Sequence, residues 1–187
     1  GSRTQTGSKI AADGIVCDKL NQNLWIYTAD CMPILVADKS KRVVAAVHCG
    51  RKGLEKKILK NLIKTFDILG SSRNDLLIAI GPSISKENYL VDKNTFVEFY
   101  KDANNKELTN LKKTHEIQLF LENLTISEKQ DLIQIDLKKY AHQQLLNENI
   151  PSTNIEISSL CTYASDDKFY SWRKTKTTMR QWNFICS

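Results

Sequence analysis

The chain has 187 residues, 41% hydrophobic and 26% charged, a balance typical of one soluble globular domain. Lysine and arginine outnumber aspartate and glutamate by 27 to 21, and the net charge of +6 favours anionic ligands. The chain lacks an apolar run of the ~18 residues that a membrane-spanning helix needs, and its five cysteines form no CxxC pair, which argues against a secreted disulfide framework and a structural zinc knuckle. We therefore expect a single cytoplasmic domain over residues 1–187 that does not enter a membrane, with Gly1-Ser2 as the scar of a cleaved expression tag.

Short β-rich runs open the chain, each bounded by turn residues such as Gly, Asn, Asp or Pro. They predict strands at residues 13–18, 23–28, 33–38 and 42–48. The third and fourth runs are almost continuously apolar, which is typical of strands covered on both faces. These two strands are therefore expected in a central sheet.

Helical spacing follows the strands. Apolar residues recur at three- and four-residue intervals over residues 53–69 and predict one amphipathic helix that stops at Gly70. A buried strand is predicted at 76–80, and a helix capped by Asp92 at 92–100.

The remaining segments complete a mixed pattern. Residues 101–131 are polar and predict a surface excursion with one strand at 117–120. A helix at 135–147 and strands at 155–160 and 181–186 follow. The order of elements predicts an α/β (α+β) fold, with a mixed central sheet and helices packed on it.

A cysteine and a histidine mark the open end of the hairpin formed by the third and fourth strands. If the turn is centred on residues 39 and 40, Cys31 faces His48, and directly opposed side chains project from the same face about 5 Å apart. The pair could share a metal ion or act as nucleophile and base. A loop with an odd number of residues would instead send the two side chains to opposite faces.

Other metal-binding groups in the chain are less suitable. A catalytic zinc usually has three protein ligands and an open position. His115 in the polar excursion and His142 in a helix are expected to be structural, and Cys49 should point away from His48 on the strand. Asp30 could supply an oxygen ligand or support one, although an aspartate at a strand start is more often a turn residue. The residues alone leave both a metal site and a Cys/His dyad open.

Ordered sequence blocks spanning residues 13–187 point to a known family. They read TADCMPILVAD, VAAVHCGRKGL, IAIGPSI and CTYASDDKFYSWRKTKTTMRQWNFI. Together they resemble the YfiH-type laccase-domain family, which is also labelled multicopper polyphenol oxidoreductase and is described as purine nucleoside phosphorylase. The resemblance implies a YfiH-like α/β fold rather than a Rossmann domain.

The resemblance also implies a metal site for Zn²⁺ or Cu²⁺. Its ligands would be Cys31, His48 and an upstream histidine that residues 3–12 do not contain, so the chain is truncated or divergent at this point. Multicopper electron transfer needs more histidines than the three in this chain. The word laccase is therefore interpreted as a family name.

The basic segment RKTKTTMR, residues 173–180, matches the family's arginine motif. Taken alone, this segment would be interpreted as a solvated loop. Guanidinium groups suit phosphate geometry. The resemblance implies catalytic roles for Cys31, His48 and Arg173, and phosphate or substrate binding by Arg51, Lys52, Ser171, Arg173 and Arg180. Lys52 departs from the family's arginine and lacks its bidentate fork.

The implied activity is metal-dependent phosphorolysis of adenosine, inosine or methylthioadenosine, with deamination of adenosine as a companion. Its partners would be a purine nucleoside and phosphate, and the protein would be a monomer or homodimer. One alternative is a hydrolase or amidase with Cys31 as nucleophile and His48 as base. Another is a basic nucleic-acid-binding or degenerate non-enzymatic domain, which is weaker because the charge is not accompanied by a recognised motif.

Overall fold

A computed structural model of the chain describes residues 11–103, 126–127, 132–165 and 167–187. Its main feature is a five-stranded mixed sheet in the order β1-β4-β3-β5-β9. Neighbouring strands are antiparallel except β5 and β9, which are parallel. The bounds of these strands are β1 Gly14–Cys17, β3 Met32–Asp38, β4 Val44–Cys49, β5 Leu76–Ile80 and β9 Ile155–Ile157. The mixed α/β architecture expected from the sequence is thus confirmed.

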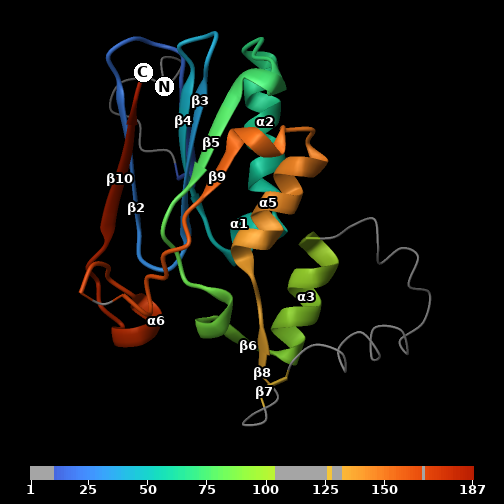
Figure 1. The fold of residues 1–187 in the computed structure, drawn as a ribbon, viewed down its shortest axis with the longest axis vertical. Helices are drawn as coiled ribbons and strands as arrows, with labels where there is room; N and C mark the ends of the chain where they lie inside the picture. Colours follow the sequence, from blue (N-terminus) through green and yellow to red (C-terminus); the bar gives the residue numbers. More distant parts are fainter. Residues whose placement is uncertain (1–10, 104–125, 128–131, 166) are drawn as a thin grey trace, which may run out of the picture.

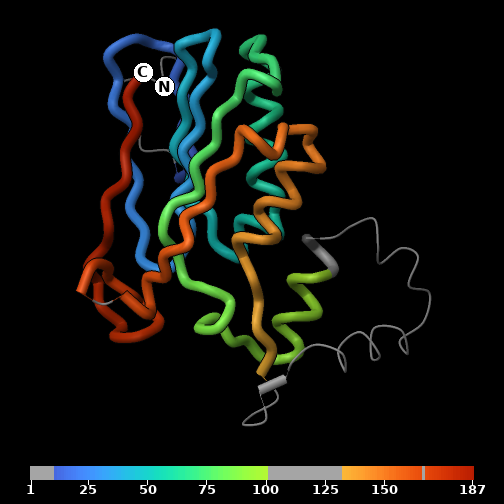
Figure 2. The backbone as a smooth tube through the Cα atoms, in the orientation of Figure 1, coloured from blue at the N-terminus to red at the C-terminus, as the bar shows by residue number. Residues whose placement is uncertain are grey.

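Two smaller sheets accompany the main one. Strands β2 (Asn23–Thr28) and β10 (Gln181–Cys186) form an antiparallel ribbon. Strands β6 (Leu90–Asp92), β8 (Leu132–Gln134) and β7 (Ile126–Ser127) form the other. Figure 2 shows the C-terminal strand running alongside β2 although most of the chain separates them.

The ribbon lies on one side of the main sheet, and helices α2 (Ile58–Ile68) and α5 (Leu137–Asn147) lie on the other (Figure 1). Strand β4 is buried on both faces because its side chains alternate between two apolar clusters. Ala45 and Val47 face the large cluster under the helices, whereas Val44 and Ala46 face a small cluster with Leu24 of the ribbon. The near-continuous apolarity of the predicted strand is explained by this double covering.

The prediction of one helix over residues 53–69 is wrong. The structure has α1 (Arg51–Glu55) and α2 (Ile58–Ile68), separated at Lys57, whose φ of 56° is left-handed. Leu54 and Leu59 are both fully buried, yet residues five apart on a continuous helix point about 140° from each other. The break allows both leucines to face the core. Helix α2 does end before Gly70, as predicted.

The other predicted helices are confirmed with small shifts. They are α3 (Lys93–Ala103) and α5 (Leu137–Asn147). A further short helix, α6 (Trp172–Thr175), was not predicted and precedes β10. The Asp92 carboxylate accepts a hydrogen bond from the backbone N–H of Thr95 at 2.9 Å, which is the predicted cap of α3. Short 3₁₀ turns span Arg73–Asp75, Lys86–Asn88 and Ser152–Asn154. Among the described residues, every helix is too short or too polar to span a bilayer.

Two predicted strands differ from the structure or cannot be compared with it. Strand β9 ends at Ile157 instead of residue 160. The strand predicted at 117–120 lies outside the described residues.

The register of the β3–β4 hairpin differs from the prediction by two residues. His48 pairs with Pro33, not Cys31. The Asp38 carboxylate accepts hydrogen bonds from the backbone N–H groups of Ser40 (2.8 Å) and Lys41 (2.9 Å), which moves the turn one residue toward the C-terminus. A shift of two residues preserves the alternation of side chains, so Cys31 and His48 still share one face.

Candidate functional site

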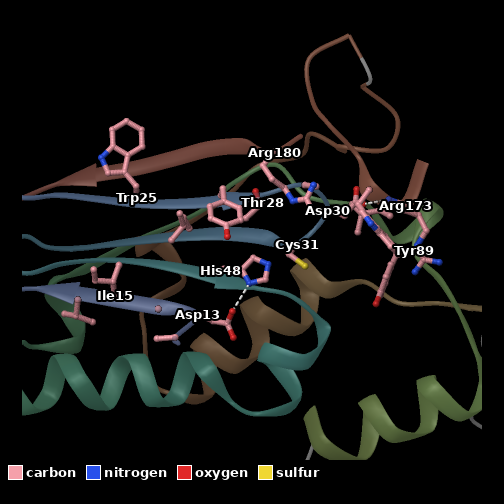
Figure 3. A pocket seen from close by; sticks show the side chains of 18 residues that line it. Asp13, Ile15, Trp25, Thr28, Asp30, Cys31, His48, Tyr89, Arg173 and Arg180 are labelled. Carbon is pink, nitrogen blue, oxygen red and sulfur yellow. Dashed lines mark hydrogen bonds and ion pairs between the residues drawn. The ribbon is translucent and has the colours of Figure 1, made fainter. Parts of the chain in front are cut away.

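A pocket of about 1050 Å³ opens at the ends of β2, β3 and β4. Its charged and reactive side chains come from segments far apart in the sequence, and Figure 3 shows them converging. They are Asp13, Asp30, Cys31, His48, Arg173 and Arg180. Its aromatic lining consists of Trp25, Tyr27, Tyr89 and Trp172. The pocket therefore combines cationic and anionic side chains, a thiol, an imidazole and flat aromatic surfaces.

Cys31 and His48 both line this pocket (Figure 3). Cys31 immediately precedes β3, and His48 is in β4. Cys49 is fully buried in the large core and points away from the pocket, as predicted. The backbone of Gly50 passes so close to Cys31 that a Cβ atom there would lie 2.6 Å from the sulfur. Gly50 thus gives the thiol the space it occupies.

The thiol of Cys31 is poorly suited to ionise without a cation. Burial raises its pKa to about 11, the negative charges of Asp30 and Asp13 raise it as well, and Arg180 opposes them. A neutral thiol is a weak nucleophile. This environment argues against the alternative in which Cys31 attacks a substrate directly.

His48 lies beside Asp13. The Nδ1 atom of His48 is 3.2 Å from Oδ1 of Asp13, and the His48 backbone N–H donates to the Asp13 carbonyl at 2.7 Å. The side chains are 38% and 68% exposed, respectively. Asp13 was not predicted as a site residue, because its position opposite His48 follows only from the pairing of β1 with β4.

Asp30 joins distant segments of the pocket. Its Oδ1 accepts hydrogen bonds from the hydroxyls of Thr162 (2.9 Å) and Ser171 (2.7 Å), and its Oδ2 accepts from the backbone N–H of Arg173 (2.7 Å). Both oxygens of this carboxylate thus accept hydrogen bonds, three in total. Asp30 therefore holds the CTY and SWRK sequence blocks against the start of β3, a role that was not predicted from the sequence.

The two arginines of the C-terminal block reach the pocket with donor capacity remaining. Arg173 donates from Nη1 to the Leu90 carbonyl at 3.2 Å, and its guanidinium carbon lies 5.0 Å from the Tyr89 ring centroid. Arg180 donates from Nη1 to its neighbouring carbonyls, at 2.9 Å to Thr177 and 2.8 Å to Met179. A guanidinium group carries further N–H donors that can bind an anion.

The other predicted anion-binding residues are not among those lining the pocket. Arg51 and Lys52 in α1 form ion pairs with Glu55, whose side chain is 5% exposed; the Lys52 Nζ–Glu55 Oε2 distance is 2.9 Å. Ser171 is buried and caps α6, accepting from the Lys174 backbone N–H at 3.2 Å. The structure thus brings together Cys31, His48 and two arginines in the pocket. Arg51 and Lys52 instead form ion pairs within α1, and Ser171 caps α6 and hydrogen-bonds Asp30.

A metal ion would find only part of its donor set here. Cysteine sulfur and imidazole nitrogen suit Zn²⁺ or Cu²⁺. Within the part of the chain that the structure describes, however, no group of three or more His, Cys, Asp or Glu side chains could hold a metal ion. Cys31 and His48 fit two positions of a zinc site, and the described residues do not complete it.

The sequence and the fold correspond to a known family. Residues 2–187 match the family model described as multi-copper polyphenol oxidoreductase laccase, and the chain belongs to this family. Two solved structures share its fold: the Bacillus licheniformis hypothetical protein YfiH, with a TM-score of 0.76 and 29% identity, and YlmD from Geobacillus stearothermophilus, with a TM-score of 0.79 and 26% identity. Each similarity covers 94% of this chain and 61% of the other.

Curated relatives are named purine nucleoside phosphorylase. One from Synechocystis is 31% identical over 94% of this chain and 68% of its own length. One from Clostridium acetobutylicum is 32% identical over 94% of this chain and 67% of its own length, and YlmD of Bacillus subtilis is 29% identical over 99% and 62%. Another, from Bacteroides thetaiotaomicron, is matched over 55% of its length. The chain thus spans about half to two thirds of these relatives.

Proposed function

We propose that this protein is a purine nucleoside phosphorylase that takes a purine nucleoside and inorganic phosphate. The names of the relatives support the reaction class. The observation that carries the proposal is the convergence of Arg173 and Arg180 on the pocket that also contains Cys31 and His48. Such a pocket offers an anion subsite beside groups that can take part in proton transfer.

Phosphate is assigned to the arginines. Two guanidinium groups can hold the phosphate oxygens by charge-assisted hydrogen bonds. Asp30 supports this arrangement because it fixes the backbone N–H of Arg173. A phosphate oxygen then forms a bond to the anomeric carbon of the ribose while the bond from that carbon to the base nitrogen breaks. The base leaves with the electron pair and is protonated, giving free purine and ribose 1-phosphate.

The nucleoside is assigned to the aromatic part of the pocket. A volume of about 1050 Å³ can accommodate a nucleoside together with phosphate. Tyr27 and Trp172 offer flat faces for a purine, which stacks favourably on aromatic rings. Adenosine, inosine and methylthioadenosine are the proposed substrates because all three present a purine ring and an anomeric C–N bond.

Cys31 and His48 are proposed as two ligands of Zn²⁺, or alternatively Cu²⁺. Their sulfur and nitrogen donors support this assignment, but the described residues provide no complete site, so no chemical step is assigned to the metal. Adenosine deamination is proposed as the companion activity. It would be recognised as inosine and ammonia formed without a requirement for phosphate.

The decisive experiment measures base release. Adenosine or inosine is incubated with the protein, with and without phosphate and with and without added Zn²⁺, and products are separated by chromatography. We expect phosphate-dependent formation of free base and ribose 1-phosphate in equal amounts. The Arg173→Ala variant should lose most of this activity, whereas Lys64→Ala, which removes an exposed lysine of α2, should retain it. Absence of phosphate-dependent base release from the unmodified protein would contradict the proposal.

A further inference from the structure

The pairing of β1 with β4 determines what lies beside His48. Gly14 pairs with Val47 in antiparallel register, and the backbone bond from His48 N–H to the Asp13 carbonyl continues the ladder by one residue pair. Opposed residues of antiparallel strands project from the same face. The Asp13 carboxylate is therefore aimed at the imidazole by the backbone itself.

The hydrogen bond between the two side chains has one chemically sensible direction. A carboxylate oxygen accepts hydrogen bonds, so the contact of 3.2 Å requires the proton to be on Nδ1 of His48. In a neutral imidazole with Nδ1 protonated, the lone pair is on Nε2. Figure 3 shows the ring in the pocket with Asp13 along one edge.

Fold stability does not account for this contact. The His48 and Asp13 side chains are 38% and 68% exposed, and exposed ion pairs contribute little to stability. The Asp13 carboxylate hydrogen-bonds a ring nitrogen of His48, so this contact selects between the two ring tautomers.

We infer that Asp13 is a positioning residue that holds His48 with its proton on Nδ1. The unprotonated Nε2, with its lone pair, is then available in the pocket. The use of that atom rests on the proposed function: the lone pair of Nε2 can accept a proton during phosphorolysis.

The tautomer can be observed directly. The chain has three histidines, so His48 can be assigned in ¹⁵N-histidine NMR spectra by comparison with the H48Q variant. Spectra are recorded without metal, at a pH where the ring is neutral. We expect a protonated Nδ1 and an unprotonated Nε2 in the unmodified protein. The Asp13→Ala variant should lose this preference, whereas Asp13→Asn, whose amide oxygen still accepts a hydrogen bond, should keep it.

A matched control separates positioning from a general loss of charge. Glu98→Ala removes an exposed acid of α3 outside the pocket and should leave the His48 spectrum unchanged. Thermal melting of all variants should match that of the unmodified protein. A proton on Nε2 in the unmodified protein, or an unchanged tautomer in Asp13→Ala, would overturn the inference.

The two proposals fail separately: an unmodified protein that releases no base contradicts the phosphorylase assignment, whereas the NMR spectrum decides the role of Asp13 in either case.

Discussion

The hydroxyl of Ser171 donates a 2.7 Å hydrogen bond to the carboxylate of Asp30, across 141 positions of sequence. Arg173 also bonds the same carboxylate through its backbone N–H. The start of β3 and the short helix α6 are thereby connected at one point. This connection holds Arg173, a candidate phosphate-binding residue, at the pocket that Cys31 also lines.

Replacing Asp30 should affect both stability and phosphate use. In Asp30→Ala the buried hydroxyl of Ser171 and the Arg173 N–H lose their acceptor, and an unsatisfied buried polar group costs about 1–3 kcal/mol. Urea unfolding should show a loss of this size. Released from its support, α6 should misplace Arg173, so KM for phosphate should rise more than KM for the nucleoside. Equal effects on both KM values would argue against Asp30 as the organiser of the anion subsite.

Replacing Arg180 with lysine should weaken phosphate binding while preserving charge. Lysine lacks the planar fork that can contact two phosphate oxygens, and a hydrogen bond to a charged group contributes about 1.5–3 kcal/mol. We therefore expect KM for phosphate to rise roughly tenfold in Arg180→Lys. Steady-state kinetics at varied phosphate would measure this effect. An unchanged KM in this variant would remove Arg180 from the phosphate subsite.

A methyl group at Gly50 should disturb the Cys31 thiol. The added Cβ would lie 2.6 Å from the sulfur, too close for any real contact, so the thiol must move. We expect Gly50→Ala to lose Zn²⁺ binding in the chelator competition assay. Gly53→Ala is the matched control, because its Cβ would lie 3.4 Å from Ile58 and the substitution favours helix α1 by about 0.5–1 kcal/mol. Similar zinc affinities in the two variants would contradict this explanation.

An ion pair far from the pocket predicts a pH effect on stability. The hydrogen bond from Arg73 to Asp67, 2.7 Å between Nη2 and Oδ2, lowers the pKa of Asp67 below its ordinary value. The folded state therefore prefers the ionised carboxylate, and the pair contributes stability above the pKa of the unfolded state. This contribution is lost as pH falls through the lower pKa of the folded state.

The effect of Asp67 should be small because its side chain is 38% exposed. Urea unfolding midpoints at pH 7 and at pH 2–3 should differ less in Asp67→Asn than in the unmodified protein. A variant with the full pH dependence of the unmodified protein would show that the pair makes no contribution.

Local patterns in the sequence predicted most of the described strands because apolar runs and turn residues are local signals. The hairpin register was wrong by two residues since the turn depends on which N–H groups the Asp38 carboxylate accepts. The shared face of Cys31 and His48 survived this error because alternation depends only on an even or odd shift. The break at Lys57 was missed because an apolar spacing of three and four residues continues across it.

Contacts between distant residues explain why the site was only partly predicted. Family motifs identified Cys31, His48, Arg173 and Arg180 as candidates, and all four line the pocket. The role of Asp30 depends on hydrogen bonds that span more than 130 positions and leave no local pattern. The ion pairs of Glu55 with Arg51 and Lys52, in contrast, have helical i,i+4 and i,i+3 spacing, which the sequence already contained.

The tryptophans in and near the pocket should also report on ligand binding through their intrinsic fluorescence. All three tryptophans are half-exposed: Trp25 at 52%, Trp172 at 50% and Trp182 at 65%. Trp25 and Trp172 line the pocket, and Trp182 lies 6.3 Å from Trp25 between ring centroids. Tryptophan fluorescence should therefore change when a nucleoside enters the pocket. The buried core contains no tryptophan among the described residues, so it would not contribute to this signal.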